Sequence, residues 1–311
     1  MTLNKKANSA FLFPGQGAQV VGMGKQIYSE SREGKAIFDE IDSALNRSLS
    51  RIMFEGPEDE LRETVNAQPA IMAVSLACLA VMTKELGEDL PKPIMMAGHS
   101  LGEYTALVAS SVLSIDDGVL LVQQRGKLMQ EACDLKPGTM AAILGLDETT
   151  MLEIAEETGT YVSNINTQEQ IVISGSIDLV PKAMNMATEH GAKRVIPLNV
   201  GGAFHSGLME SAKEGLTDAV NSMRFNNPSV PIIANCTGSP LVDGEEIKLE
   251  LITQISGCVN WKKTIDYMTS ADINNYYEIG PGRALSGMIR KINSDAVVTN
   301  INDIESVLAI K

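Results

Sequence analysis

Three short apolar stretches along the chain are each followed by a glycine-rich turn and a helix-forming segment. They are residues 9–13 (SAFLF), 93–97 (PIMMA) and 276–280 (YYEIG). An apolar run of this length is typical of a strand that is buried on both faces. We therefore predict a parallel sheet covered by helices on both sides. After the loop that follows residue 13, the pattern predicts a helical stretch that ends near Glu40.

The pattern changes between residues 139 and 198, where shorter segments follow one another closely. The order is strand, helix, strand, strand, helix, strand, which is the βαββαβ pattern of a ferredoxin-like subdomain. We expect this insert to occupy residues 129–198, inside a larger α/β domain formed by residues 1–128 and 199–311. The predicted strands are 139–146, 161–166, 170–175 and 192–198, and the predicted helices are 149–158 and 178–190.

The longest apolar run, residues 70–82 (AIMAVSLACLAVM), predicts a buried helix and not a membrane span. It is too short to cross a bilayer and contains Ser75 and Cys78. The N-terminal residues 1–13 include two lysines but only a short apolar segment, so they lack the apolar region and cleavage site of a signal peptide. We expect a cytoplasmic protein.

Composition and charge narrow the function classes. The 311 residues are 44% hydrophobic and 21% charged, as in a globular protein with a sizeable core. A formal net charge of −14 argues against a nucleic-acid partner, because phosphate contacts need an excess of Lys and Arg on one face. Small anionic ligands stay possible where positive charge is concentrated locally.

The cysteines do not predict a metal site or a disulfide framework. Cys78, Cys133, Cys236 and Cys258 are widely spaced and form no CxxC pair. None has a histidine nearby in the sequence. This spacing favours free thiols and no bound metal.

The sequence GHSLG, residues 98–102, fits the pattern G-x-S-x-G. In that pattern a serine lies on a tight turn between a strand and a helix, where any side chain on the flanking residues would clash. Here the motif follows the predicted strand 93–97 and precedes a helix-forming segment, which is the context that the motif requires. Ser100 is therefore a candidate nucleophile, with a flexible serine turn as the alternative.

A serine nucleophile needs a base, and the chain has three histidines. His99 adjoins Ser100 and should point away from it on a sharp turn, while His190 precedes Gly191 and resembles a charge at a helix C-terminus. His205 remains. It lies just before Ser206, a good N-cap for a helix that runs to about Asn221, and a helix N-terminus would keep the imidazole neutral. The alternative is a loop histidine with a surface role.

Arg125 lies four residues after Leu121 and three before Leu128, in line with apolar residues of a predicted helix. Two interpretations stay open. The side chain could extend along an apolar margin and pair internally, as many arginines do. It could instead direct its guanidinium at a substrate carboxylate through two parallel hydrogen bonds.

Five motifs in this order resemble the malonyl-coenzyme A:acyl carrier protein transacylase family. They are FPGQG at 13–17, GHSLGEY at 98–104, QQRG at 123–126, GAFHS at 202–206 and the GPG of EIGPG, which begins at 278. The resemblance covers nearly the whole chain. It implies an α/β-hydrolase-like core with a ferredoxin-like insert, in agreement with the pattern of elements.

The resemblance also implies roles for individual residues. Ser100 would be the nucleophile, His205 the general base and then general acid, and Arg125 the ligand of the malonyl carboxylate. The backbone N–H groups of Gln16 and Leu101 would form the oxyanion hole.

Two further roles follow from the resemblance alone. The backbone carbonyl of Gln254 would orient the histidine, a role that the residues by themselves do not predict. Phe204 and Leu101 match positions of malonyl-selective members, and the phenyl ring of Phe204 would crowd a methyl branch on the substrate. One such clash is worth only about 1–3 kcal/mol, so we expect a strong but incomplete preference for malonyl.

The implied reaction is a ping-pong transfer of malonyl from malonyl-CoA to the phosphopantetheine thiol of acyl carrier protein, without a cofactor. Both partners are acidic, so they would dock on local positive patches. Candidates are Lys193 with Arg194, Lys262 with Lys263, and Arg290 with Lys291, although each could be ordinary solvated surface. The alternatives are a serine hydrolase or thioesterase of the same fold, and a non-catalytic carrier-binding protein.

Overall fold

The computed structural model describes residues 8–310, and its largest element is a six-stranded sheet in the order β10-β9-β1-β2-β7-β8. Neighbouring strands are parallel except β7 and β8, which form a short antiparallel pair. The strands are β1 Ser9–Phe13, β2 Pro93–Gly98, β7 Ile232–Ile233, β8 Pro240–Leu241, β9 Asn275–Ile279 and β10 Val297–Ile301. The predicted parallel sheet is confirmed, with three strands that the sequence pattern did not predict.

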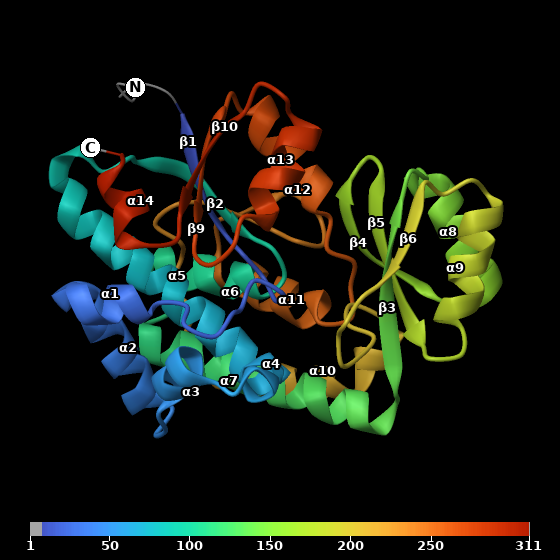
Figure 1. Ribbon diagram of the computed structural model, residues 1–311, viewed down its shortest axis with the longest axis horizontal. Helices are drawn as coiled ribbons and strands as arrows, with labels where there is room; N and C mark the ends of the chain where they lie inside the picture. The colour runs from blue at the N-terminus through green and yellow to red at the C-terminus, as the bar shows by residue number, and fades with distance from the viewer. Residues whose placement is uncertain (1–7, 311) are drawn as a thin grey trace.

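Both faces of this sheet are covered, as the apolar strands predict (Figure 1). All five residues of β1 are buried. Phe11 and Phe13 pack on one side into the cluster that contains the helices α2 (Arg32–Ala44), α5 (Thr64–Leu86), α6 (Leu101–Ala109) and α7 (Ile115–Leu135). Ala10 and Leu12 pack on the other side against α12 (Trp261–Ser270) and α13 (Ala284–Ile292). Successive side chains of a strand point to opposite faces, so a strand between two helical layers needs apolar residues at every position.

The helices around the large sheet come from both ends of the chain. They are α1 Lys25–Glu30, α2 Arg32–Ala44, α3 Leu49–Glu55, α4 Glu58–Arg62, α5 Thr64–Leu86, α6 Leu101–Ala109, α7 Ile115–Leu135, α10 Glu210–Asn221, α11 Gly244–Gln254, α12 Trp261–Ser270, α13 Ala284–Ile292 and α14 Ile304–Leu308. The same region also contains two short 3₁₀ turns, η1 Gly87–Asp89 and η2 Gly207–Met209.

The first helical stretch differs from the prediction, because it is two helices and not one. Helix α1 ends at Glu30, and Ser31 adopts an extended backbone whose side chain accepts a hydrogen bond from the N–H of Gly34. A serine in this conformation is an N-cap that starts a new helix. The second helix continues to Ala44, beyond the predicted end near Glu40.

Helix α5 contains the apolar run 70–82, and the prediction of a buried helix is confirmed. The helix is longer than the run, because polar residues at both ends extend it to 23 residues. Among residues 8–310, the segment Thr64–Asp89 is the one helix long and apolar enough to cross a membrane, but 83% of its most apolar window is buried inside the fold. The prediction relied on the shortness of the apolar run, but the helix is long enough to span a membrane. Its burial inside the fold is what identifies α5 as a core helix.

Residues 138–197 form the second sheet, which is antiparallel and has the order β4-β5-β3-β6. Helices α8 and α9 cover its outer face (Figure 1). The strands are β3 Gly138–Leu144, β4 Tyr161–Thr167, β5 Gln170–Ser176 and β6 Arg194–Pro197, and the helices are α8 Glu148–Thr158 and α9 Val180–Glu189. The βαββαβ order is confirmed, while the domain boundaries at 128/129 and 198/199 stay a prediction.

Candidate active site

Ser100 lies on the turn between β2 and α6, with a backbone φ of 52°. The two flanking glycines are needed because the backbone comes very close on both sides. A Cβ on Gly98 would lie 1.9 Å from the carbonyl carbon of Gly102, and one on Gly102 would lie 2.0 Å from the carbonyl oxygen of Phe13. The Ser100 N–H donates to Asn235 Oδ1 at 2.7 Å. These contacts hold the hydroxyl at the carboxyl end of the sheet, as G-x-S-x-G predicts.

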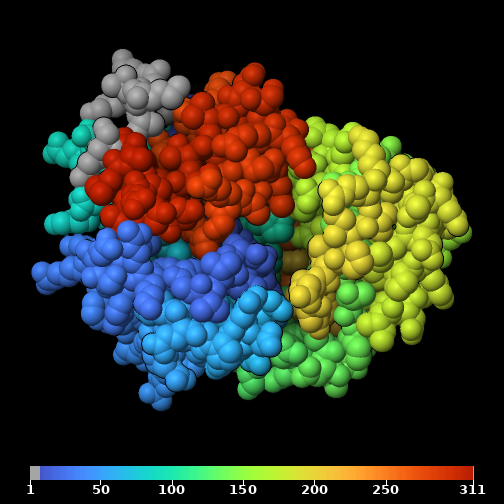
Figure 2. All heavy atoms as spheres, viewed as in Figure 1, coloured from blue at the N-terminus to red at the C-terminus, as the bar shows by residue number. Residues whose placement is uncertain are grey.

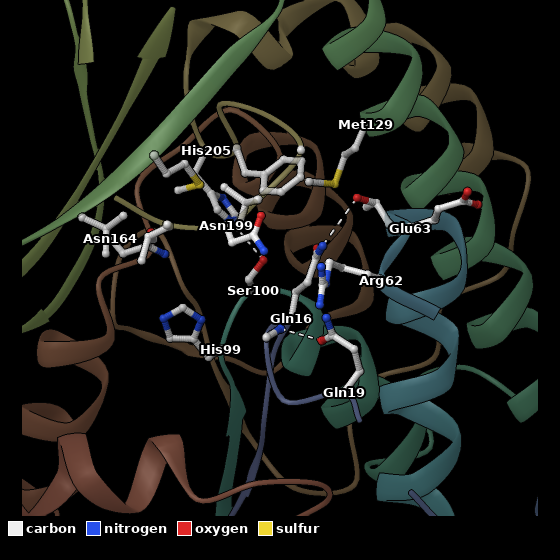
Figure 3. A pocket seen from close by; sticks show the side chains of 18 of the residues that line it. Gln16, Gln19, Arg62, Glu63, His99, Ser100, Met129, Asn164, Asn199 and His205 are labelled. Atoms are coloured by element: carbon white, nitrogen blue, oxygen red, sulfur yellow. Dashed lines mark hydrogen bonds between the residues drawn. The ribbon is translucent and has the colours of Figure 1, made fainter. Parts of the chain in front are cut away.

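The His205 ring lies against Ser100, with Nε2 at 2.7 Å from the serine Oγ (Figure 3). On the other side of the ring, Nδ1 faces the backbone carbonyls of Gln254 at 2.9 Å and Gly257 at 3.2 Å. Carbonyl oxygens only accept hydrogen bonds, so Nδ1 carries the ring proton and Nε2 is free to accept one from the serine hydroxyl.

The electrostatic surroundings keep His205 neutral. Burial, followed by the positive charge of Arg125, lowers the pKa of His205 to about 3. The sequence predicted a different cause, the N-terminus of a helix capped by Ser206. In the structure Ser206 instead caps the short turn η2 by accepting from the N–H of Leu208, and the N-cap of α10 is Met209. A neutral, hydrogen-bonded imidazole is the form that a general base requires.

The other two histidines lie elsewhere, as the sequence predicts. His99 Nε2 lies 3.0 Å from Asn166 Oδ1, so its ring is directed toward β4 and away from the serine hydroxyl (Figure 3). His190 is exposed at the C-cap of α9, where its Nδ1 lies 2.8 Å from the carbonyl of Met186.

Arg125 is 1% exposed, which excludes a side chain that extends to solvent. Its Nη2 donates to Ser100 Oγ at 3.1 Å and to Gln254 Oε1 at 3.0 Å, and its Nη1 donates to Gln68 Oε1 at 2.7 Å. All three acceptors are neutral. Within residues 8–310, no carboxylate lies within ion-pairing distance of this guanidinium. A buried cation beside the hydroxyl can therefore bind an anion that enters the site.

Two backbone N–H groups lie beside the serine turn. Leu101 is the first residue of α6, directly after Ser100, and Gln16 lies in the loop after β1. That loop packs on the turn, since a Cβ on Gly15 would lie 2.4 Å from the carbonyl oxygen of His99. In the part of the chain that the structure describes, neither the Gln16 nor the Leu101 N–H donates to a protein acceptor. Such free donors are what an oxyanion hole requires.

A cavity of about 740 Å³ opens in front of Ser100 and His205. Its wall combines Gln16 and Phe204 from the large-sheet region with Asn164 and Asn166 of β4. Figure 2 shows a depression where the blue N-terminal segments, the red C-terminal segments and the yellow segment near residue 200 meet. The cavity therefore runs along the junction of the two sheets.

Comparisons with known proteins identify the relatives of this chain. A family profile described as "Acyl transferase domain" matches residues 10–280. A malonyl CoA-acyl carrier protein transacylase of Bacillus subtilis is 41% identical over 308 residues, which cover 97% of this chain and 96% of that protein. The chain belongs to the acyl transferase family.

Solved structures of acyl transferases agree with the fold. A crystal structure of acyl-carrier-protein-S-malonyltransferase from Bartonella henselae is 41% identical, has a TM-score of 0.93, and covers 97% of this chain and 98% of its own. A second structure shows a type II PKS acyl carrier protein in complex with its malonyl-transacylase. It is 34% identical, with a TM-score of 0.93, and covers 98% of this chain and 99% of that chain. The resemblance read from the five motifs is confirmed, and so is the fold class.

Gln254 is the residue of this acyl transferase that could not be found from the sequence without the family resemblance. It is the last residue of α11, and the last carbonyls of a helix have no partner within the helix. The Gln254 carbonyl is thus free to accept from His205, and its side chain contacts Arg125 and the backbone of Ser100. Because the contact to His205 uses the backbone, no sequence pattern reveals it.

Within residues 8–310, no group of three or more His, Cys, Asp or Glu side chains is arranged to hold a metal ion.

Proposed function

We propose that this acyl transferase moves a malonyl group from malonyl-CoA to the phosphopantetheine thiol of acyl carrier protein, through a malonyl ester of Ser100. The observation that carries the proposal is the buried Arg125 guanidinium, 3.1 Å from the hydroxyl that His205 also contacts. A malonyl thioester presents a carbonyl and, two bonds away, a carboxylate. Bound with its carbonyl at Ser100, it places that carboxylate at Arg125. The malonyl transacylase names of the relatives support the same substrate.

In the first half-reaction, the Ser100 Oγ attacks the thioester carbonyl while its proton passes to His205 Nε2. The N–H groups of Gln16 and Leu101 stabilise the resulting oxyanion. The carbon–sulfur bond then breaks, and the imidazolium returns the proton to the sulfur of coenzyme A. The hydrogen bonds from Nδ1 to the carbonyls of Gln254 and Gly257 stabilise the transient imidazolium.

The second half-reaction reverses these steps with a different thiol. His205 takes the proton from the phosphopantetheine thiol of acyl carrier protein, and the sulfur attacks the malonyl-serine ester. The carbon–oxygen bond to Ser100 breaks, and the imidazolium returns the proton to the serine oxygen. Because coenzyme A must leave before the second thiol enters the same cavity, the kinetics are ping-pong.

Two features favour transfer over hydrolysis: the buried Arg125 cation, which binds a substrate carboxylate, and the partners of His205. A hydrolase of this fold completes its triad with an aspartate or glutamate, whereas His205 here faces two backbone carbonyls. The match to the acyl transferase family also supports transfer. A carrier-binding protein without activity would not require a hydroxyl, an imidazole and a guanidinium in mutual contact.

Docking of the acidic partners is favoured at one of the basic patches. Lys193, Arg194 and Lys291 line a second cavity, of about 490 Å³, although they come from separate parts of the sequence. Lys193 also pairs with Glu169 at 2.8 Å. Lys262 likewise pairs with Asp266, one helical turn away, so the shared cavity and not the ion pairing distinguishes the first patch. We therefore assign the docking of acyl carrier protein to the patch that joins β6 and α13.

Three finer expectations belong to the same proposal. The Phe204 ring, which is 6% exposed and lines the cavity, crowds a branch on the α-carbon and favours malonyl over methylmalonyl. Residues 129–198 form the smaller of two domains, with 1–128 and 199–311 as the larger. The reaction takes place in the cytoplasm.

The test is intact-protein mass spectrometry after mixing with malonyl-CoA. The wild-type chain should gain one malonyl group and lose it when phosphopantetheinylated acyl carrier protein is added, with malonyl appearing on the carrier. Ser100→Ala should stay unlabelled, while Ser270→Ala, at an exposed serine that ends α12, should label like the wild type. Labelling of Ser100→Ala, or release of free malonate in place of malonyl carrier, would refute the proposal.

A further inference from the structure

Glu103 is a fully buried carboxylate that the proposed mechanism does not use. It lies one turn into α6 from Ser100 and has 0% exposure. Its Oε1 accepts from the N–H of Asn235 at 3.0 Å, and its Oε2 accepts from Gln254 Nε2 at 2.6 Å. A buried carboxylate is costly unless it is hydrogen-bonded and balanced by a positive charge.

The Gln254 side chain connects this carboxylate to the guanidinium. Gln254 Oε1 accepts from Arg125 Nη2, while Gln254 Nε2 donates to the Ser100 carbonyl at 2.9 Å and to Glu103. Only this orientation of the carboxamide satisfies every partner, because a guanidinium can only donate while the carbonyl and the carboxylate only accept. Glu103 thereby determines which end of the Gln254 side chain faces Arg125.

The two hydrogen bonds that Glu103 accepts stabilise its ionised form, while burial opposes it. Burial and the nearby Glu250 carboxyl raise the pKa of Glu103 well above its usual range, and the two N–H donors and Arg125 offset only part of this rise. A proton on Oε2 would face the donor Nε2 and would turn the Gln254 carboxamide, so that its NH₂ group met Arg125. The observed contact between Arg125 and Gln254 Oε1 is the one that an accepting carboxyl oxygen at Glu103 favours.

We propose that Glu103 is a positioning residue for malonyl selection, which holds Arg125 at Ser100 through the Gln254 carboxamide and balances its charge without touching it. This inference rests on the proposed malonyl transfer and deepens it. The three neutral acceptors engage three of the five guanidinium donors. A carboxylate in direct contact would occupy the position that the substrate carboxylate needs, whereas one separated by an amide leaves it open.

The experiment compares malonyl-CoA and acetyl-CoA loading in the full-length chain with Glu103→Gln. This change keeps the size of the side chain but directs an NH₂ group at a neighbouring donor, either Gln254 Nε2 or the Asn235 N–H. We expect the malonyl KM to rise about tenfold or more, as for the loss of a hydrogen bond to a charged group. The acetyl KM should change by less than about threefold, because acetyl has no carboxylate for Arg125 to bind.

Glu250→Gln is the matched control, because it changes a neighbouring buried carboxyl whose Oε1 accepts from the N–H of Cys236. It should leave the malonyl-to-acetyl ratio of kcat/KM unchanged. The double variant Glu103→Gln with Gln254→Glu restores the donor and acceptor pair between positions 103 and 254. It places the negative charge directly on Arg125 and removes the donor to the Ser100 carbonyl, so acetyl loading is measured beside malonyl loading. It should fold, keep the backbone contact to His205 and still load malonyl poorly.

The outcomes separate this inference from the function on which it rests. If the wild type loads no malonyl, the proposed function itself is refuted. If the wild type loads malonyl and Glu103→Gln keeps its selectivity, or loses malonyl and acetyl loading equally, the positioning role is wrong. A double variant with the wild-type malonyl KM would also overturn it.

Discussion

The two sheets of this acyl transferase bury very different side chains. Between the antiparallel sheet and its two helices, the buried cluster is apolar, with Ile143, Ile171 and Ile173 at its centre. Beyond the carboxyl end of β2 in the parallel sheet, the buried groups are Glu103, His205 and the guanidinium of Arg125. The first arrangement contributes apolar packing, whereas the second depends on specific hydrogen bonds between its buried polar groups.

The small sheet also contributes to the site, but through its other face. Ile171 and Ile173 of β5 point to the helices, and Val172 between them lines the cavity. Residues of β4 line the same wall. The proposed chemistry thus uses the polar cluster of the large sheet, and the small sheet contributes one wall of the cavity.

The largest loss of activity is expected for His205→Ala. Without the imidazole, nothing accepts the serine proton, and malonyl loading should fall about 10⁴-fold or more. His190→Ala removes an exposed histidine at the end of α9 and should leave loading unchanged. Stopped-flow or rapid-quench loading rates measure both. A His205→Ala enzyme with nearly normal rates would place the base elsewhere.

A smaller loss is expected for Gly102→Ala. The added Cβ would lie 2.0 Å from the carbonyl oxygen of Phe13, so the turn that carries Ser100 must shift. Misplacement by about 1 Å can cost about 10²-fold in rate, and we expect a loss of that order. In Gly287→Ala, on α13, the new Cβ meets nothing within 4 Å, so activity should be unchanged and stability slightly higher. Equal behaviour of the two variants would contradict the role of the close approach.

A moderate change is expected in how the loading activity depends on pH. Because the pKa of His205 is lowered to about 3, it stays neutral, and kcat/KM for acetyl loading in the wild type should be flat between about pH 5 and 8. Arg125→Met removes one of the causes of the lowered pKa, so the loss of activity on the acid side should move to higher pH. Wild-type activity that falls with a midpoint near the ordinary histidine pKa would show that His205 is not shielded as described.

The same pKa shift predicts a contribution to stability. Between about pH 3 and the ordinary histidine pKa, the unfolded chain binds a proton at His205 that the folded chain does not. This group therefore makes the free energy of unfolding increase as the pH rises through that window. Denaturant unfolding of wild type and His205→Ala across the window measures the contribution, and parallel curves for the two would rule it out.

The smallest effect on chemistry is expected in the apolar cluster. Ile173→Ala leaves a cavity between β5 and the helices and should lower the free energy of unfolding by about 2–5 kcal/mol. The malonyl-to-acetyl preference of the folded enzyme should stay the same, since Ile173 faces away from the cavity. A changed preference would mean that the two regions are coupled more strongly than their contacts indicate.

The sequence predicted those parts of the fold in which one residue pattern has one structural outcome. The run at residues 9–13 needs two apolar layers and is β1, and G-x-S-x-G has room for its serine turn only with glycine on both sides. Strand β10 was not predicted, because Val297–Ile301 is a partly exposed edge strand with Thr299 and Asn300 in it. The break at Ser31 was missed because the residues on both sides form helices.

The site was only partly predictable, for a physical reason. The pattern around Arg125 showed that the side chain lay among apolar residues, but only the three-dimensional contacts decide between an internal pair and a free cation. Gln254 acts through its backbone carbonyl on His205, and any residue type carries such a group. The contact between Gln254 and Glu103 joins residues 151 positions apart, which no local pattern can reveal.

In the proposed reaction, the Arg125 guanidinium selects a substrate with a carboxylate. The most direct measurement is a competition in which wild type and Arg125→Ala load from an equal mixture of malonyl-CoA and acetyl-CoA, with the two acyl-enzymes resolved by mass spectrometry. We expect that the wild type carries malonyl almost entirely and that the variant loses malonyl loading far more than acetyl loading. Equal losses of both acyl groups in Arg125→Ala would contradict this role of Arg125.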